Sequence, residues 1–229
     1  MKLEILRNTT YPVLDTYQKK IADELRQGLR KEGVWILSEL QAVITRGRRT
    51  QSEDVFTSQT PVVDVDRGGL ATWHGPGQWV FFCVEKMEKL FGDPRAIKKA
   101  ILWQLEATCE LAKLYRSDAR VERGDRLGVW CDEGKLASIG VSIQNGVLQH
   151  GVSLNVYKTE GSFEGLRMCG LSDQPAYLLT PTSEQSKQEN ESLFVSLGRN
   201  WVTCLELALH EFSQAQIDSP RWHSSIHGS

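Results

Sequence analysis

Residues 67–78 read RGGLATWHGPGQ, which places four glycines, a proline, an arginine and a histidine within twelve residues. Glycine loses more backbone entropy on ordering than any other residue, and proline lacks a donor, so neither a helix nor a strand gains from this composition. The flanking segments PVVDVD (61–66) and QWVFFCV (78–84) predict two strands, the second of them buried. A glycine-rich segment between two strands indicates a shaped loop whose bare backbone approaches a ligand closely.

The rest of the chain predicts one α+β, or mixed α/β, domain over residues 1–229, because strands and hairpins alternate with helices and no linker divides them. Apolar residues at helical spacing predict three helices, at about 14–32, 92–115 and 188–212. Further strands are expected at 34–40 and 42–47. The tail at about 215–229 is expected to be frayed.

Two short signals set the ends of these elements. In the helix at 92–115, Asp93 is expected to be the N-cap and Pro94 the first helical residue. Asn145-Gly146 stands between two alternating runs, and this dipeptide strongly predicts a type I′ hairpin.

The composition excludes several classes of protein. The 229 residues are 40% hydrophobic and 24% charged, with a formal net charge of −2, and this balance gives no reason to expect general nucleic-acid binding, which favours a strongly basic face. No apolar run approaches the roughly 20 residues that span a bilayer, and the charged N-terminus lacks a signal-peptide core. The five cysteines are widely spaced and form no CxxC pair, which argues against a disulfide framework or a zinc ribbon and favours a reducing cytoplasm.

The glycine-rich loop is not a phosphate-binding P-loop, because no Gly-Lys-Ser/Thr closes it and a strand follows it. It offers a row of backbone N–H groups beside Arg67, Thr72 and His74. Such a lining suits a carbonyl or a developing oxyanion. The alternative is a glycine-rich turn stabilised by its own polar side chains, and the loop alone does not decide between the two.

One cysteine and one lysine are candidates for chemistry. Cys169 lies in the predicted loop RMCGLS, where the following glycine exposes the backbone beside the sulfur. Lys135 begins a predicted strand with small residues, and the alternative for it is a solvated hairpin lysine. Cys131 precedes a turn and has no neighbour in the sequence that would activate it. The remaining cysteines are predicted to be packing residues in apolar stripes: Cys83, Cys109 and Cys204.

Four separated motifs, RGGLATWHGPGQ, GVW...GKLASIGV, HGVSLNV and CG, occur in the order and at the spacing of lipoyl(octanoyl) transferases, and the sequence resembles that family over about residues 35–175. The family resembles the catalytic domains of biotin and lipoate protein ligases, in which helices flank a central mixed sheet. Its members transfer an octanoyl or lipoyl group from acyl carrier protein to a lysine of lipoyl domains, in 2-oxoacid dehydrogenases and in the glycine cleavage H protein. The resemblance implies a cytoplasmic, monomeric acyltransferase of lipoate biosynthesis that needs neither a cofactor nor a metal and binds neither nucleic acid nor membrane.

The resemblance also assigns roles to residues. It implies that Cys169 is the nucleophile that forms a thioester intermediate and that Lys135 activates it. His150 and Asn155 match the HG...LN pattern and are expected to shape the site. The acyl-binding residues implied by the resemblance are Arg67, Gly68, Gly69, Leu70, Ala71, Thr72, Trp73, His74, Ser138, Ile139, Gly140, Gly151, Val152 and Ser153.

The sequence departs from the family pattern at a few positions. Trp73 replaces the usual tyrosine, Phe82-Cys83 stands where Tyr-Pro is common, and Met168 stands where proline is usual. TRGRRT (45–50) resembles the corresponding loop of biotin ligases. The alternative functions are therefore an ATP-dependent lipoate or biotin ligase, a non-catalytic acyl-binding protein and, more weakly, a thioesterase.

A partner surface is also expected. Acyl carrier proteins are acidic, so a near-neutral transferase needs a local basic patch. The candidates are a first cluster, Arg46, Arg48 and Arg49, and a second, Lys98 with Lys99, for which a solvated face is the favoured alternative.

Overall fold

The structure is a computed structural model, and it describes residues 1–56, 59–166, 174–179 and 187–218. Its strands are β1 (Lys2–Thr9), β2 (Val34–Leu40), β3 (Val43–Arg46), β4 (Val62–Asp64), β5 (Thr72–His74), β6 (Gln78–Lys86), β7 (Arg120–Glu122), β8 (Gly128–Cys131), β9 (Gly134–Gln144) and β10 (Val147–Asn155). Its helices are α1 (Tyr11–Arg26), α2 (Met87–Phe91), α3 (Ile97–Lys113) and α4 (Lys187–Asp218), with short 3₁₀ turns η1 (Ser52–Asp54) and η2 (Gly124–Arg126).

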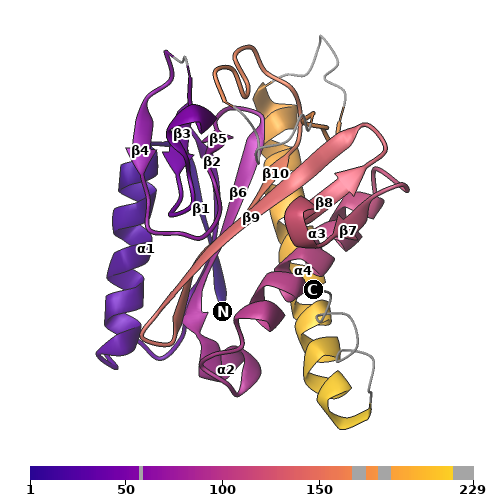
Figure 1. Ribbon diagram of the computed structural model, residues 1–229. Coiled ribbons are helices and arrows are strands. Elements are labelled where there is room, and N and C mark those ends of the chain that lie inside the picture. The colour runs from indigo at the N-terminus through magenta and orange to yellow at the C-terminus, as the bar shows by residue number, and fades with distance from the viewer. Residues whose placement is uncertain (57–58, 167–173, 180–186, 219–229) are drawn as a thin grey trace.

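A seven-stranded sheet in the order β1-β2-β6-β10-β9-β8-β7 forms the centre of the molecule. Strands β1 and β2 are parallel, and the other neighbours are antiparallel, so the sheet is mixed. Helix α1 covers one face, while α3 and α4 cover the other (Figure 1). A second sheet, β4-β3-β5, is formed near one end of the first. A mixed sheet flanked by helices confirms the predicted fold class.

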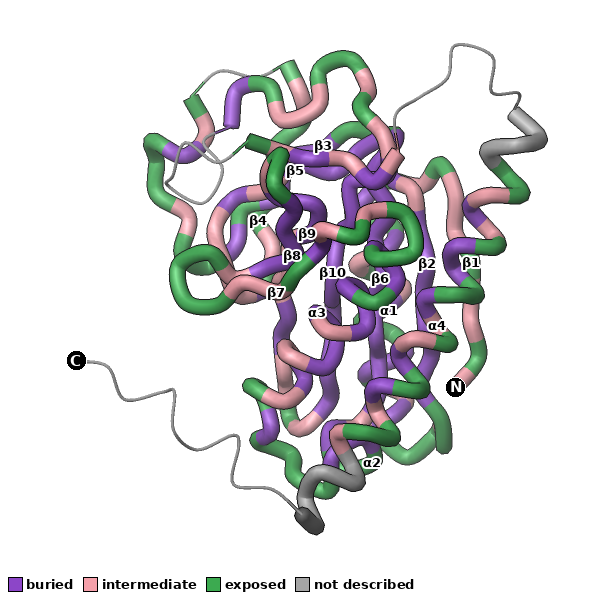
Figure 2. The backbone as a smooth tube through the Cα atoms, turned by 90° about the vertical axis from the view of Figure 1, so that its right-hand side faces the viewer, coloured by how far each residue is buried: buried purple, intermediate pink, exposed green. Residues whose placement is uncertain are grey.

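Strand β6 has two apolar faces, which explains the unbroken run QWVFFCV. Val80, Phe82 and Val84 belong to the apolar cluster under α1. The alternate residues Trp79, Phe81 and Cys83 belong to the larger cluster under α3 and α4. Because successive side chains point to opposite faces of a sheet, a strand covered on both sides must be apolar at every position. The centre of the sheet is accordingly the most buried part of the chain (Figure 2).

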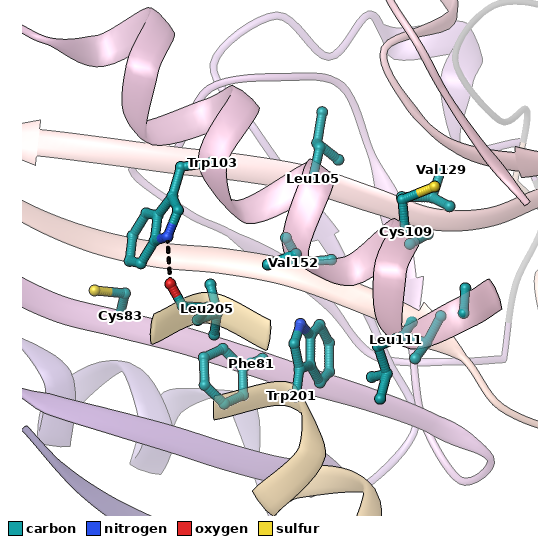
Figure 3. Packing of buried hydrophobic residues seen from close by; sticks show 14 of the residues in the cluster. Phe81, Cys83, Trp103, Leu105, Cys109, Leu111, Val129, Val152, Trp201 and Leu205 are labelled. Carbon is teal, nitrogen blue, oxygen red and sulfur yellow. Dashed lines mark hydrogen bonds between the residues drawn. The ribbon is translucent and has the colours of Figure 1, made fainter. Parts of the chain in front are cut away.

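Two tryptophans join α3 to α4 through both packing and polar contacts (Figure 3). The Trp103 indole donates to the Leu205 carbonyl at 2.8 Å, and the Trp201 indole donates to Thr108 Oγ1 at 3.0 Å. Trp201 also stacks on Phe81, with 4.8 Å between the ring centroids. Both indole N–H groups are therefore satisfied inside the core, where an unpaired donor would be costly.

Several predicted boundaries are confirmed and others are wrong. Asn145 and Gly146 have φ values of 48° and 75°, which confirms the I′ hairpin between β9 and β10. The helix predicted from residue 92 begins instead at Ile97, because Gly92 adopts φ 67° and ends α2, while the Asp93 carboxylate accepts the Arg95 N–H at 2.8 Å within a turn.

The edges of the fold also differ from expectation. Strand β1 was not predicted, since its charged sequence lacks an apolar run. Strand β4 is largely exposed and belongs to the second sheet, so the glycine-rich loop does not join two core strands. At the C-terminus α4 continues to Asp218, which corrects the start of the predicted frayed tail, and residues 219–229 lie outside the described part of the chain. Within the described residues, no helix is both long and apolar enough to cross a bilayer.

A buried polar cluster attaches α1 to β10. Gln18 accepts the backbone N–H of His150 at 2.9 Å, and its amide nitrogen lies 2.8 Å from Asp15 Oδ1 and 3.0 Å from His150 Nδ1. The Tyr11 hydroxyl lies 3.2 Å from the same ring nitrogen. Burial is the main cause that lowers the pKa of His150 to about 4, so the ring is neutral and Nδ1 accepts.

Acidification should destabilise this fold. The pKa values of His150 and of the buried His74, about 4 and about 3, lie below the ordinary 6.5, so the unfolded chain binds protons more readily. The stability that each neutral ring contributes is complete above about pH 6.5 and is lost as the pH falls toward the folded value. Between pH 7 and pH 5 each histidine should cost up to about 2 kcal/mol of unfolding free energy, measured by urea titration.

His150→Asn is the matched control, because asparagine tolerates the φ of 62° at this position but does not titrate. This variant should be less stable than wild type at pH 7 but lose only about half as much stability on acidification. An unchanged pH dependence in the variant would contradict the assignment.

Candidate active site

A cavity of about 750 Å³ lies beside the glycine-rich loop, with β6, β9 and β10 contributing to its wall. The predicted site residues that line it are Arg67, Gly69, Leu70, Ala71, Thr72, His74, Lys135, Ser138, Ile139, Gly140, Gly151, Val152 and Ser153. Residues that the sequence did not predict to belong to the site also line it: Tyr11, Gln51, Val80, Phe82, Gly124, Asp125 and Leu127. A volume of this size is typical of a site for a small organic ligand.

Some predicted residues are not among those that line the cavity. The Gly68 N–H donates to the Val141 carbonyl, which attaches the loop to β9. Trp73 is buried in a separate small cluster, with its ring 5.3 Å from that of Phe163. His150 and Asn155 are buried behind the wall. Cys169 lies outside the described residues, as does Met168.

Arg67 determines the shape of the glycine-rich loop. The side chain is 6% exposed, and its Nη1 donates to the carbonyls of Gly68 and Leu70, both at 3.0 Å. Its Nη2 donates to Thr45 Oγ1 at 2.8 Å and to the Thr45 carbonyl at 3.2 Å. A Cβ at Gly140 would lie 2.9 Å from Arg67 Cδ, so only glycine fits there. The two interpretations of the loop therefore hold together: its own polar side chain stabilises it, and its backbone lines a cavity.

Lys135 is a buried residue of the cavity wall and not a solvated hairpin lysine. It is 3% exposed, and its Nζ lies 5.3 Å from the centre of the Trp130 ring. Its backbone N–H donates to the Gln174 carbonyl, and its own carbonyl accepts the Ala176 N–H, both at 2.9 Å. Because residues 174–176 follow the undescribed segment that contains Cys169, the backbone of Lys135 is tied to the chain immediately after it.

Gly128 is a site residue that sequence reasoning missed. A Cβ at this position would lie 2.6 Å from Lys135 Cε and 2.5 Å from the Ala137 carbonyl oxygen. The bare backbone thus makes room for the lysine side chain. Its signal in the sequence was a glycine directly before an apolar strand, which is a place where close approach of another group is common.

His74 is held by two neighbours that the sequence also did not identify. Burial, and next the charge of Arg67, lower its pKa to about 3, so the ring is neutral. Its Nδ1 lies 2.7 Å from Gln78 Oε1, and its Nε2 lies 3.3 Å from Thr45 Oγ1. Tyr11 stacks on it, with 5.8 Å between the ring centroids. Both ring nitrogens are occupied by protein groups, so His74 is placed to orient its neighbours.

The other cysteines are separate from the cavity. Burial raises the pKa values of the Cys83, Cys109 and Cys204 thiols, as expected for packing residues. Arg116 Nη2 lies 3.5 Å from the Cys131 sulfur, but Cys131 is 2% exposed and lines no part of the cavity. In the described part of the chain, no group of three or more His, Cys, Asp and Glu residues could hold a metal.

The arginines of the first basic cluster differ in their pairing. Arg46 pairs with Asp64 at 2.7 Å, and Arg48 pairs with Asp66 at 2.5 Å. Arg49 has no ion pair among the described residues, and it lines the cavity together with Arg48. Lys98 and Lys99 lie in the first turn of α3, and they likewise have no ion pair within the ranges described.

Comparisons with known proteins agree with this geometry. Residues 15–218 match the lipoyl protein ligase A/B catalytic domain. An octanoyltransferase of Rhodococcus opacus is 36% identical over 162 residues, which are 68% of this chain and 62% of that protein. An octanoyltransferase of Corynebacterium jeikeium is 37% identical over 186 residues, 72% of each chain.

Among solved structures, lipoate-protein ligase A bound with ATP has a TM-score of 0.62 at 13% identity, covering 93% of this chain and 94% of that one. At this identity the likeness concerns the fold alone. The match to the family model and the identity to the curated relatives are far stronger signals. The chain belongs to the lipoyl protein ligase A/B catalytic domain family, among the lipoyl(octanoyl) transferases.

Proposed function

We propose that this protein transfers an octanoyl group from acyl carrier protein to a lysine of a lipoyl domain, through a thioester on Cys169, as a step of lipoate biosynthesis. The observation that carries the proposal is Lys135, a buried lysine in the wall of a cavity that apolar side chains, glycines and further polar groups also line. The names of the curated relatives support it as well. The acceptors would be lipoyl domains of 2-oxoacid dehydrogenases and the glycine cleavage H protein, in the cytoplasm, and the enzyme would act as a monomer.

In the first step the Cys169 thiolate attacks the carbonyl carbon of the donor thioester. The new C–S bond forms, the bond to the carrier sulfur breaks, and the carrier thiolate leaves and takes a proton from the Lys135 ammonium. A free thiol has a pKa near 8.5, so a cation beside the sulfur is needed to make the thiolate abundant at neutral pH. The glycine-rich wall leaves room for the acyl chain and its carbonyl.

In the second step the target lysine attacks the acyl-enzyme. Its amine must be uncharged, and neutral Lys135 accepts the proton that the amine loses as the amide bond forms. The C–S bond to Cys169 breaks and the thiolate is regenerated. Because a thioester is already activated and an amide is more stable, neither ATP nor a metal is required.

An ATP-dependent ligase is the competing function, and two observations favour it: the fold is shared with a ligase solved with ATP, and Arg48 and Arg49 line the cavity. Octanoyl-carrier protein, apo-lipoyl domain and the enzyme, mixed without nucleotide, decide between the two. Formation of octanoyl-lipoyl domain supports the transferase. Product only when octanoate and ATP are supplied would show a ligase, and free octanoate without an acceptor would show a thioesterase.

The catalytic pair makes a prediction about the intermediate. Cys169→Ser should form no acyl-enzyme at neutral pH, because a serine hydroxyl is hardly ionised there. Lys135→Met should acylate at least about tenfold more slowly, since each pKa unit of the thiol changes the thiolate fraction up to tenfold. Raising the pH should partly rescue Lys135→Met but not Cys169→Ser. Intact mass after mixing with octanoyl-carrier protein measures the intermediate.

The remaining cysteines are the controls for this experiment. Substitution of Cys83, Cys109, Cys131 or Cys204 by alanine should leave the acyl-enzyme intact, although the buried sites will lose stability. Full acylation of Cys169→Ser, or an unchanged rate and pH profile in Lys135→Met, would refute the assignment of these residues.

Docking of the acidic carrier protein makes a second prediction. Arg49→Glu should raise KM for octanoyl-carrier protein several-fold and flatten its dependence on salt, because Arg49 is an exposed cation at the cavity without an ion pair in the described chain. Lys98→Glu, at the start of α3, is the matched charge reversal and should change KM little. Equal effects of the two reversals, or none of either, would contradict docking at the first cluster.

A further inference from the structure

A continuous series of hydrogen bonds runs through the interior from the glycine-rich loop to Lys135. It begins where Arg67 Nη2 donates to Thr45 Oγ1 at 2.8 Å, and the same hydroxyl lies 3.3 Å from His74 Nε2. His74 Nδ1 lies 2.7 Å from Gln78 Oε1. The series then continues through Gln78 Nε2 to Asn155 Oδ1 at 2.9 Å, and through Asn155 Nδ2 to the Lys135 carbonyl at 3.1 Å.

The Lys135 end of this series fixes its direction. A carbonyl only accepts, so the Asn155 nitrogen must face Lys135 and its oxygen must face Gln78. Gln78 therefore donates to Asn155 and accepts from His74, which places the proton of the neutral His74 ring on Nδ1 and the lone pair on Nε2. At the other end a guanidinium only donates, so the Thr45 hydroxyl accepts from Arg67 and can use its own proton toward His74 Nε2.

The Lys135 end of the series connects two backbone segments: the start of β9, which carries Lys135, and residues 176–178, which follow the segment that contains Cys169. The Lys135 carbonyl accepts from Asn155 and also from the Ala176 N–H. The Asn155 carbonyl accepts the Leu178 N–H at 2.9 Å. Asn155 thus joins the start of β9, which carries Lys135, to the segment that follows the residues around Cys169.

On the basis of the proposed function, we propose that Thr45, Gln78 and Asn155 are positioning residues. Their side chains form a hydrogen-bond relay that runs in one direction and holds His74 as the Nδ1–H tautomer. The relay also fixes the backbone of Lys135 relative to the acyl-binding loop. All the side chains that the relay joins are buried, with Thr45 at 0% and Gln78 at 2% exposure, so water does not compete for the bonds. Misplacement of a reacting group by about 1 Å can cost about 100-fold in rate.

The tautomer provides a test that does not depend on activity. Long-range ¹H–¹⁵N spectra of the ¹⁵N-histidine-labelled protein distinguish Nδ1–H from Nε2–H, and a His74→Gln variant assigns the signals. We expect Nδ1–H in the wild type. In Gln78→Met the acceptor for Nδ1–H is gone, so the proton should move to Nε2, which can donate to Thr45. In Asn155→Asp the bond to Gln78 is kept, so the tautomer should stay Nδ1–H.

Kinetics separate positioning from folding. Gln78→Met and Asn155→Asp should each lower kcat for octanoyl transfer at least about tenfold, with a smaller change in KM for the carrier, because both disconnect Lys135 from the loop. Gln149→Met is the matched control: Gln149 is also a buried glutamine, and its amide nitrogen has no partner among the described residues. It should keep the wild-type kcat, and urea titration of all three variants checks that each is folded.

An Nε2–H tautomer in the wild type overturns the relay. So does an unchanged kcat in both relay variants, or an equal fall in kcat in Gln149→Met. If the wild type transfers no octanoyl group, the proposed function fails, and the tautomers of wild type and Gln78→Met then decide alone whether the relay exists.

Discussion

The site depends on the hydrogen bonds that the buried guanidinium of Arg67 donates to the glycine-rich loop and to Thr45. A cation taken out of water is costly unless oxygens replace its hydration, and here the loop carbonyls and Thr45 supply those oxygens. The loop curls around the charge to do so, and Gly69 adopts a φ of 91° next to the guanidinium. The same charge helps to lower the pKa of His74, and the Arg67 side chain packs against Gly140. The loop, the second sheet and β9 are thus organised around one side chain.

This arrangement is supported by a scaffold whose stability comes from elsewhere. The larger apolar cluster lies under α3 and α4, on the face of β6 away from α1, and contains four buried tryptophans, Trp35, Trp79, Trp103 and Trp201. The cavity wall, by contrast, combines apolar side chains such as Val80 and Phe82 with glycines and with buried polar groups such as Arg67 and Lys135. Its glycines and polar groups contribute little hydrophobic stabilisation, which comes mainly from the apolar clusters on the two faces of the central sheet.

Much of the fold could be predicted because its signals are local. The apolar run of β6 and the Asn145-Gly146 turn each depend on a few neighbouring residues. The beginning of α3 could not be predicted, since Gly92 belongs to the preceding short helix and its left-handed φ competes with the capping signal at Asp93. Strand β1 depends on pairing with β2, a partner more than 20 residues away, and its own sequence carries no periodic signal.

The candidate site was accessible from the sequence only where motifs mark it. Composition and local pattern led to the glycine-rich loop and to Lys135, resemblance added the β9 and β10 segments, and the structure places most of these around one cavity. Thr45, Gln78 and Gly128 were not identified, because their roles arise from contacts between strands that are distant in the chain. Gln78 is the last residue of the glycine-rich motif 67–78, yet nothing in the neighbouring sequence shows that its amide connects a histidine to an asparagine.

The alternation along β6 gives neighbouring residues different functions. Phe82 lines the cavity and meets the rings of Tyr11 and His150 edge to face, and it also belongs to the apolar cluster under α1. Its neighbour Cys83 is fully buried in the cluster on the opposite face of the sheet. An exchange at position 82 therefore changes ligand selection and thermal tolerance together, whereas an exchange at position 83 changes thermal tolerance without altering the cavity wall.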